Sequence, residues 1–334
     1  MNRFAKIKKI KFKLLMLLLM TVVIFEFFLF IFLPKEKVIN TESEYGIEIK
    51  SLEENLSTNP NDVDILTKLG KLYFKVGKYD LSEEFLKKAL EINPNFVSAL
   101  LEMGNVLRYR GHYAESEQMF KNAISLDPEN VWIYIDLGKL YRNWNKYSKA
   151  EETFKLAMKL NPDADVLYSY GLGFLYRDEG KLDEALAMFQ KALELNPESD
   201  FNYMAMGDIY RDLKRYEESE QMFKKALEMN PLSESYMGLG WLYSFQGRSE
   251  EAEAAFKKYL EVIKPKSEVY FGLGEIYFKE DRLGEAEEMY KKAVELNPTL
   301  GAYYGLYKLY ERQGKTEEAK DMLEKYNYFN LKKE

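Results

Sequence analysis

Apolar and polar residues follow helical spacing through most of the chain after residue 60, and residues 97–130 show this pattern clearly. Apolar and small residues recur three or four positions apart over 100–107, Gly111 interrupts the spacing, and the pattern resumes over 116–123 until Pro128 stops it. The segment therefore predicts a helix, a turn and a second helix. Gly111 can supply the positive φ that a helix C-terminus often needs.

The same pattern returns at a nearly constant interval. A small residue marks one place in each unit, 33 to 35 residues apart, at Gly70, Gly104, Gly138, Gly173, Gly207, Gly240 and Gly274, with Tyr307 in the last place. A fixed period of this size indicates a solenoid, in which each unit buries its apolar face against its neighbours. We expect eight such units over residues 63–326, with no interior domain boundary and no room for a closed catalytic domain.

A half unit precedes the first full one. In residues 47–62 the sequence resembles the second helix of a unit, because Asn59-Pro60 lies 34 residues before Asn93-Pro94. A mostly polar helix there can cover the open apolar end of the array, so we interpret it as an N-terminal cap. Residues 34–46 are expected to be a polar spacer and residues 327–334 a C-terminal tail.

The chain begins with a basic head, residues 1–13, followed by twenty mostly apolar residues, 14–33. At 1.5 Å per residue a helix of that length spans roughly 30 Å, the hydrocarbon core of a bilayer. A cleaved signal peptide has a shorter apolar core and a small-residue cleavage site, which this segment lacks. We therefore predict a transmembrane signal anchor at 14–33.

Charges on the two sides of this span predict its orientation. Six Lys or Arg precede it, whereas only Lys35 and Lys37 follow closely. Because positive flanks remain inside, we expect a single-pass protein of the cell membrane with its repeats on the non-cytoplasmic side.

The repeated residues resemble the tetratricopeptide repeat family. In residues 63–96 the family pattern corresponds to Leu66, Leu69, Gly70, Tyr73, Gly77, Ser82, Leu86, Ala89 and Pro94. The resemblance implies an all-α, right-handed α-solenoid of about eight helix-turn-helix repeats, here preceded by one transmembrane helix and a half-repeat cap.

Some positions depart from the family pattern. Asn145 and Asp281 replace the turn glycine, which is tolerable because these residues enter the left-handed region readily; Lys214 fits less well. Tyr259 and Tyr326 stand where Ala is usual, and Tyr307 where Gly is usual. These large residues put the close helix packing of repeats six and eight in doubt.

Composition and charge argue against several kinds of ligand and site. The net charge is −7, and residues 1–37 carry +6, so the remaining chain carries −13. An acidic array argues against nucleic acid as a ligand, because duplex binding needs a basic stripe. There are no cysteines, the one histidine, His112, follows the turn glycine, and no phosphate-binding loop or nucleophile motif occurs. We expect no enzymatic activity, no metal and no cofactor.

The family resemblance implies that first helices line a concave groove. The residues expected there are Leu101, Arg108, Trp132, Ile135, Arg142, Tyr170, Phe174, Arg177, Phe201, Met204, Arg211, Met237, Trp241, Phe271 and Tyr304. An apolar lining of this length is typical of surfaces that recognise protein segments, although packing between neighbouring repeats could also account for it. The four arginines could hold carboxylates of a partner, or could pair inside the array, for instance with Asp178, Asp208 or Asp212.

The sequence thus favours a membrane-anchored scaffold that holds a protein or peptide partner for assembly, secretion or envelope maintenance. Two alternatives remain open. One is a structural protein whose repeats assemble into a homo-oligomer, and the other is an inert accessory subunit that positions an enzyme encoded elsewhere.

Overall fold

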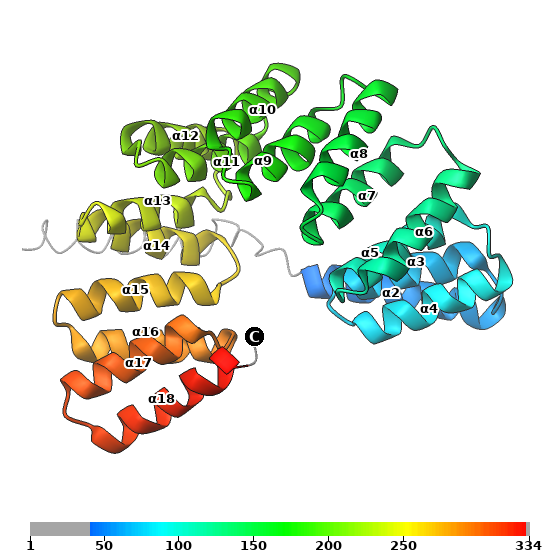
Figure 1. Ribbon diagram of the computed structural model, residues 1–334. Helices are drawn as coiled ribbons and strands as arrows, with labels where there is room; N and C mark the ends of the chain where they lie inside the picture. The colour runs from blue at the N-terminus through cyan, green and yellow to red at the C-terminus, as the bar shows by residue number, and fades with distance from the viewer. Residues whose placement is uncertain (1–40, 332–334) are drawn as a thin grey trace, which may run out of the picture. The chain divides into compact units, whose positions relative to one another are not determined.

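The computed structural model describes residues 41–331, and this part of the chain contains helices joined by short turns, with no strand. From Tyr45 onward the described chain forms one compact unit. The helices occur in pairs that follow one another along the array, as Figure 1 shows. The first helix of the chain after the undescribed residues is α2, Thr41–Thr58.

Repeats one to four contain α3 (Val63–Lys75), α4 (Tyr79–Ile92), α5 (Val97–Tyr109), α6 (Tyr113–Leu126), α7 (Val131–Asn143), α8 (Tyr147–Leu160), η1 (Leu167–Gly173), α9 (Phe174–Asp178) and α10 (Leu182–Leu195). Repeats five to eight contain α11 (Asp200–Asp212), α12 (Tyr216–Met229), α13 (Ser235–Phe245), α14 (Ser249–Val262), α15 (Ser267–Lys279), α16 (Leu283–Leu296), α17 (Leu300–Arg312) and α18 (Thr316–Leu331). The predicted all-α solenoid of helix pairs is confirmed.

Two predicted boundaries are wrong. Helix α2 begins at Thr41, inside the segment expected to be a spacer, and α18 continues to Leu331, inside the expected tail. At both ends the chain keeps its helical backbone further than the repeat pattern runs. The reason is that helix propensity and backbone hydrogen bonds do not depend on the packing residues from which the boundaries were predicted.

The turns inside the repeats confirm their predicted chemistry. Gly111 has φ 79°, and the residues that replace glycine also lie in the left-handed region, Asn145 at φ 56°, Lys214 at 60° and Asp281 at 64°. The turn geometry is therefore kept in all eight repeats whichever residue occupies it.

An aromatic ring of the second helix fixes the distance between helices. Phe256 is fully buried, and a Cβ built on Gly240 of its own repeat would lie 2.5 Å from its ring. On the other side, a Cβ on Gly272 of the next repeat would lie 2.6 Å away. Both contacts are shorter than a real Cβ allows, so the ring fits only because two glycines face it. The same ring therefore packs the repeat internally and joins it to the next one.

Tyr259 does not disturb this packing. Its side chain is fully buried, and its hydroxyl lies near Glu234 and Glu268 at the starts of two first helices. The first helix of the same repeat, α13, has 11 residues, whereas α11 and α15, the first helices of the two neighbouring repeats, have 13. Since Phe256 still packs tightly against Gly240, the doubt about close packing in repeat six is not borne out.

Tyrosine–glutamate hydrogen bonds form a second link between repeats. The tyrosine stands near the end of a first helix and donates to a glutamate on the second helix of the preceding repeat. The bonds are Tyr141 to Glu117 (2.9 Å), Tyr176 to Glu151 (3.0 Å), Tyr243 to Glu220 (3.1 Å), Tyr277 to Glu253 (2.9 Å) and Tyr310 to Glu287 (3.1 Å). Likewise, Tyr73 donates to Glu53 of α2 at 2.5 Å, which attaches the predicted half-repeat cap to repeat one.

Within residues 41–331, no helix combines the length and the apolar character needed to cross a membrane. The predicted anchor at 14–33 and the basic head at 1–13 lie outside the described residues.

Candidate protein-binding surface

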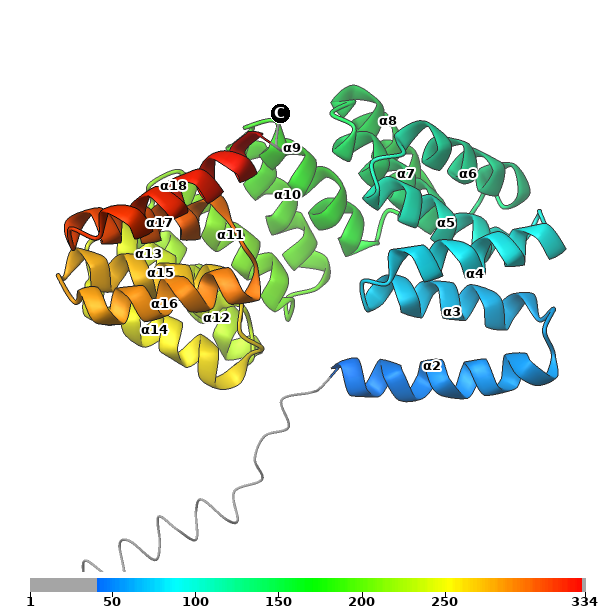
Figure 2. The ribbon, with the colours of Figure 1, turned by 90° about the horizontal axis from the view of Figure 1, so that it is seen from below.

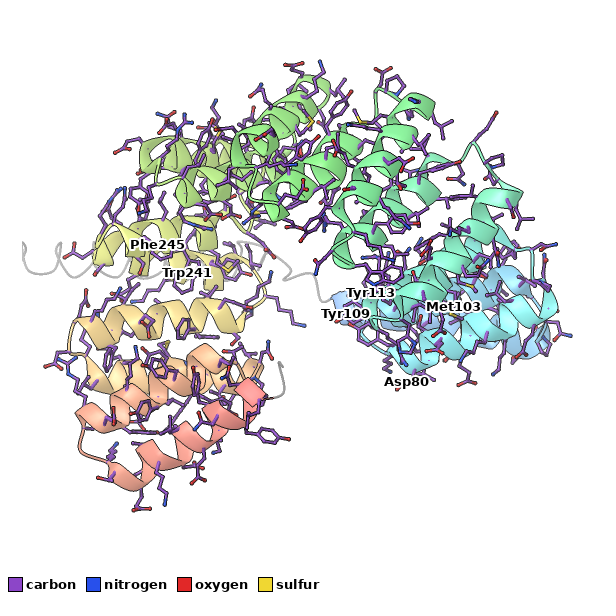
Figure 3. All side chains as sticks on the ribbon, in the orientation of Figure 1. Asp80, Met103, Tyr109, Tyr113, Trp241 and Phe245 are labelled. Atoms are coloured by element: carbon purple, nitrogen blue, oxygen red, sulfur yellow. The ribbon has the colours of Figure 1, made fainter. Side chains whose placement is uncertain are left out.

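The first helices of neighbouring repeats contact one another directly, in addition to their contacts with second helices. Helices α3, α5 and α7 are joined in this way, as are α11, α13, α15 and α17. We call the exposed side of these helices, together with η1 and α9, the first-helix surface. Trp241 and Phe245, both on α13, are labelled in Figure 3, and Phe245 is 64% exposed.

The structure places most predicted residues on this surface, but at different depths. Trp132 has 60% of its surface exposed, and Tyr170 and Tyr304 are also exposed. The apolar residues that are half-buried are Leu101, Phe174, Phe201, Met204, Met237, Trp241 and Phe271. Ile135 is fully buried in the core of repeats two to four, so its assignment to the binding surface is wrong.

Tyr170 lies on an irregular helix. The interval from Gly138 to Gly173 is 35 residues, one more than between Gly173 and Gly207, and residues Leu167–Gly173 form a π-helix. Such a segment accommodates one extra residue within a helical ladder. The Tyr170 ring stacks on Phe201 of the next repeat, with ring centres 4.4 Å apart. The π-helix thus places an aromatic pair across the junction of repeats four and five.

A second aromatic group lies on repeats six and seven. The Trp241 ring lies 6.1 Å from Phe271 and 6.4 Å from Phe245. Phe245 is an exposed member of this group, although it was not among the residues predicted for the surface. Its position, four residues after Trp241 on one helix, was the available signal, because residues four apart share a helix face.

The predicted arginine ladder is mostly paired inside the array. Three of the four arginines meet an aspartate, Arg142 at 3.3 Å from Asp178, Arg177 at 3.7 Å from Asp212 and Arg211 at 2.7 Å from Asp208. These aspartates are the partners that the internal-pairing alternative named. In addition, Arg142 donates to the Tyr170 carbonyl at 3.3 Å, which ties the ladder to the π-helix.

Arg108 differs from the other three. Its guanidinium donates to Asn105 at 3.0 Å, and among the described residues no carboxylate lies within ion-pair distance of it. Burial lowers the pKa of Arg108, although the charge of Asp136 opposes this shift. Arg108 is thus the member of the ladder best able to receive an acceptor from outside.

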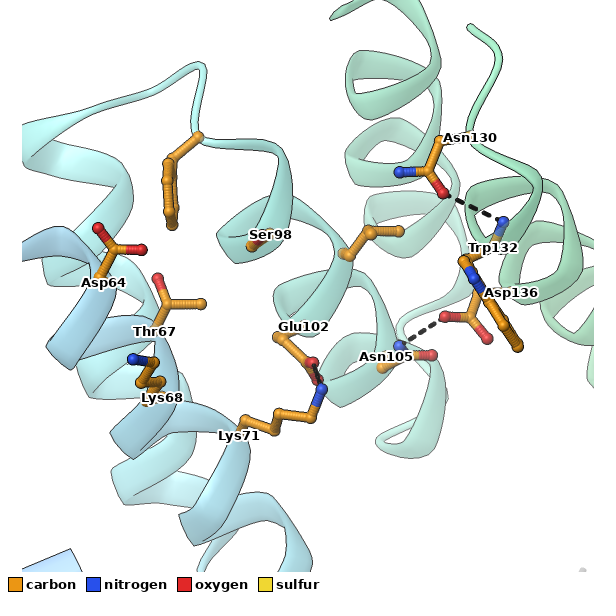
Figure 4. Close-up of a pocket in the computed structure, with 12 residues that line it drawn as sticks. Asp64, Thr67, Lys68, Lys71, Ser98, Glu102, Asn105, Asn130, Trp132 and Asp136 are labelled. Atoms are coloured by element: carbon orange, nitrogen blue, oxygen red, sulfur yellow. Dashed lines mark hydrogen bonds and ion pairs between the residues drawn. The ribbon is translucent and has the colours of Figure 1, made fainter. Parts of the chain in front are cut away.

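A pocket of about 450 Å³ opens on repeats one to three, between α3, α5 and α7 (Figure 4). Its walls carry Trp132 and Leu101 beside charged groups, and two of these are already paired, since Lys71 lies 2.7 Å from Glu102. Asn105 donates to Asp136 at 3.0 Å across the same pocket. Leu101 and Trp132 were predicted for the binding surface, and the pocket brings them together.

No group of three or more acidic or histidine side chains in the described chain is placed to hold a metal ion. His112 lies 3.4 Å from Glu115 at the start of α6, on the surface. The first-helix surface offers aromatic rings, methionines and paired charges, which suit recognition of another chain.

Comparisons with known proteins agree with this geometry. Solved structures with the same fold include yeast Tom70 (TM-score 0.68, 19% identity, 82% of this chain and 60% of that chain covered), a tetratricopeptide repeat protein from Parabacteroides merdae ATCC 43184 (0.56, 22%, 78% and 98%) and the human IFIT1 dimer with m7Gppp-AAAA (0.58, 18%, 86% and 78%). The chain thus spans less than two thirds of the Tom70 chain. At these identities the likeness concerns the fold alone. No curated protein matches the chain.

Family models described as tetratricopeptide repeat match residues 63–96, 85–118, 107–170, 164–231, 198–264 and 267–300. These segments together make up more than half of the 334 residues. The chain belongs to the tetratricopeptide repeat family.

Proposed function

We propose that the protein is a non-catalytic scaffold that holds a segment of a partner protein on its first-helix surface. The observation that carries this proposal is the succession of exposed aromatic rings on that surface, Trp132, Tyr170, Phe245 and Tyr304. These rings lie on repeats three, four, six and eight, and exposed aromatic residues along one surface are typical of protein-binding sites, where such rings become the main anchors.

Apolar contacts, rather than the arginine ladder, should carry most of the affinity. Arg142, Arg177 and Arg211 already face aspartates, so a partner carboxylate would have to displace an existing pair to reach them. We therefore propose that the partner segment presents apolar side chains to the rings. Arg108, which has no carboxylate within ion-pair distance among the described residues, would donate to a single acceptor group of the partner.

Substitution of the exposed rings tests this proposal. The full-length chain, carrying a photo-crosslinking residue on a first helix, is expected to capture the same partner proteins from its host repeatedly. Trp132→Ser with Phe245→Ser should remove most of that capture, whereas Leu156→Ser, a 44% exposed residue on the second helix α8, should not. If the ring variant captures as wild type does, or if both variants lose capture equally, the partner binds elsewhere.

We also propose that residues 14–33 anchor the scaffold in the cell membrane, with the repeats on the non-cytoplasmic side. Support comes from the apolar run and from the six positive residues before it. A reporter that is active only in the cytoplasm, fused after residue 334, should be inactive. High activity of this fusion would contradict the orientation, and recovery of the chain in the soluble fraction would contradict the anchor.

A further inference from the structure

Two of the seven junctions between the described repeats lack the tyrosine–glutamate bond. Between repeats four and five the tyrosine, Tyr210, is present but Leu186 stands in place of the glutamate, whereas between repeats one and two the tyrosine itself is missing. Seven of the eight repeats have a tyrosine near the end of the first helix, at Tyr73, Tyr141, Tyr176, Tyr210, Tyr243, Tyr277 and Tyr310. The second repeat has Leu107 in this place. Leu107 has neither a ring to fill the space nor a hydroxyl to donate.

A complete junction shows what is missing. Between repeats five and six, Glu220 receives three donors, Lys224 at 2.7 Å, Arg248 at 3.0 Å and the hydroxyl of Tyr243 at 3.1 Å. Burial by itself would raise the pKa of Glu220, but these hydrogen bonds outweigh it and lower the pKa. The charge of the Glu220 carboxylate is thus balanced by two cations, and a neutral hydroxyl supplies its third hydrogen bond.

Glu83 occupies the equivalent place before Leu107 and keeps the two cations. Lys87 lies 2.5 Å from one of its oxygens and Arg110 lies 3.2 Å from the other. Its side chain is 19% exposed, compared with 20% for Glu220. The carboxylate is therefore placed and charge-balanced as in the complete junction, but the neutral donor is missing.

A pocket of about 490 Å³ lies beside Leu107, where the other junctions have the tyrosine ring. It lies between α4 and α6, with Met103 and Leu107 of α5 on its floor, Leu90 and Met119 on its sides and Glu83 on its rim. Met103 is labelled in Figure 3. The pocket shares no lining residue with the pocket of Figure 4.

We propose that this pocket binds a tyrosine side chain of a partner protein, at a site separate from the first-helix surface. The partner's ring would pack on Met103, Met119 and Leu90, since methionine sulfur makes favourable contacts with aromatic rings. Its hydroxyl would donate to Glu83, as Tyr243 donates to Glu220. The intermolecular contact thus repeats one that the array makes five times between its own repeats.

Other occupants fit less well. A phenylalanine would fill the same volume but would bury Glu83 without supplying the donor, which is unfavourable for a buried acceptor. A lysine or arginine would add a third cation to a carboxylate that Lys87 and Arg110 already balance. The preference for a neutral hydroxyl is therefore the specific part of the proposal.

Methionine methyl groups report on the site directly. The full-length chain with 13C-labelled methionine methyls is titrated with N-acetyl-tyrosinamide and, separately, with N-acetyl-phenylalaninamide, which differ by one hydroxyl. The methyls of Met103 and Met119 should shift selectively, and the tyrosine derivative should bind about tenfold more tightly, as a hydrogen bond to a charged group provides.

Two variants check the assignment. Leu107→Tyr supplies the missing side chain internally, so it should abolish the shifts and raise the melting temperature. Glu83→Met removes the acceptor but keeps an apolar wall, so it should retain binding while the preference for the tyrosine derivative disappears. The proposal is overturned if neither methyl moves, if both probes bind wild type equally, or if N-acetyl-argininamide binds more tightly than the tyrosine derivative.

Discussion

Each glycine that faces an aromatic ring sets how closely two helices can approach. At Gly104 an added Cβ would lie 2.7 Å from the ring of Phe120, which is itself fully buried. The ring has no room to withdraw, because its own surroundings are packed on all sides. A single methyl group should therefore be costly at this position, although alanine favours helices over glycine.

Gly104→Ala is expected to destabilise the array by about 1 to 3 kcal/mol through overpacking against Phe120. Gly284 is the matched control, because it also lies in a helix, α16, but has nothing within 4 Å of the added Cβ. Gly284→Ala should be neutral or stabilise by up to about 1 kcal/mol. Urea unfolding followed by circular dichroism measures both, and equal effects at the two glycines would contradict the packing argument.

How much could be predicted from the sequence differs from residue to residue. The turn geometry of Asn145 and Asp281 was predictable, because it depends on local backbone preference alone. The burial of Ile135 and the exposure of Phe245 were not. A repeat pattern says which way a side chain points on its own helix, but depth depends on how neighbouring repeats cover it.

At the scale of helices, the tyrosine–glutamate bonds link stability to pH. Burial alone would raise the pKa of Glu253, but hydrogen bonds from Lys257, Arg282 and Tyr277 prevail and lower it to about 2. In the unfolded chain the pKa of a glutamate is about 4.3. Because the folded state favours the ionised form, this contribution to stability is present above pH ~4.3 and disappears as the pH falls towards 2.

Tyr277→Phe should weaken this dependence, since it removes one of the hydrogen bonds that keep Glu253 ionised, and should cost about 1 kcal/mol at neutral pH. Tyr134→Phe is the control, because its hydroxyl donates at 2.9 Å to the carbonyl of Pro128, which does not titrate. Unfolding midpoints between pH 7 and pH 2 give the comparison. If the two variants lose stability in parallel over this range, Tyr277 does not act through Glu253.

The π-helix shows the limit of prediction at this scale. The interval of 35 residues was visible in the sequence, and it marked the repeat with an extra residue. The interval does not say whether that residue lengthens a turn or enters a helix. Gly171 and Gly173, at the C-terminal end of the segment, pack against Phe154 and Phe189, and the extra residue is accommodated as a π-helix.

For the molecule as a whole, the two terminal helices act as polar covers. Figure 2 shows α2 beside α3 and α18 beside α17, at opposite ends of the series of helices. The outer residues of α18 include exposed Glu317, Lys320 and Glu324, and Lys325 pairs with Asp321 at 2.8 Å. These exposed residues of α18, the second helix of repeat eight, give the C-terminal end of the described array a polar face.

End-to-end assembly of copies should therefore be unfavourable. We expect the chain, kept in a mild detergent because of its apolar N-terminal run, to have the mass of one copy by size-exclusion chromatography with light scattering. Replacing Lys320 and Glu324 together by Leu should create an apolar end and promote association. A concentration-dependent dimer of the wild-type chain would instead favour the self-assembling structural alternative.

The aromatic rings shared between repeats also determine how the protein would respond to tension. A globular domain resists stretching until one core breaks, whereas here every junction resists separately, and the cap helix α2 and repeat eight are each held from one side only. A pulling force on the two ends should peel repeats away from the termini in equal steps, each releasing on the order of 100 Å of chain. Between a moving attachment and a fixed one, such an array would behave as an extensible tether.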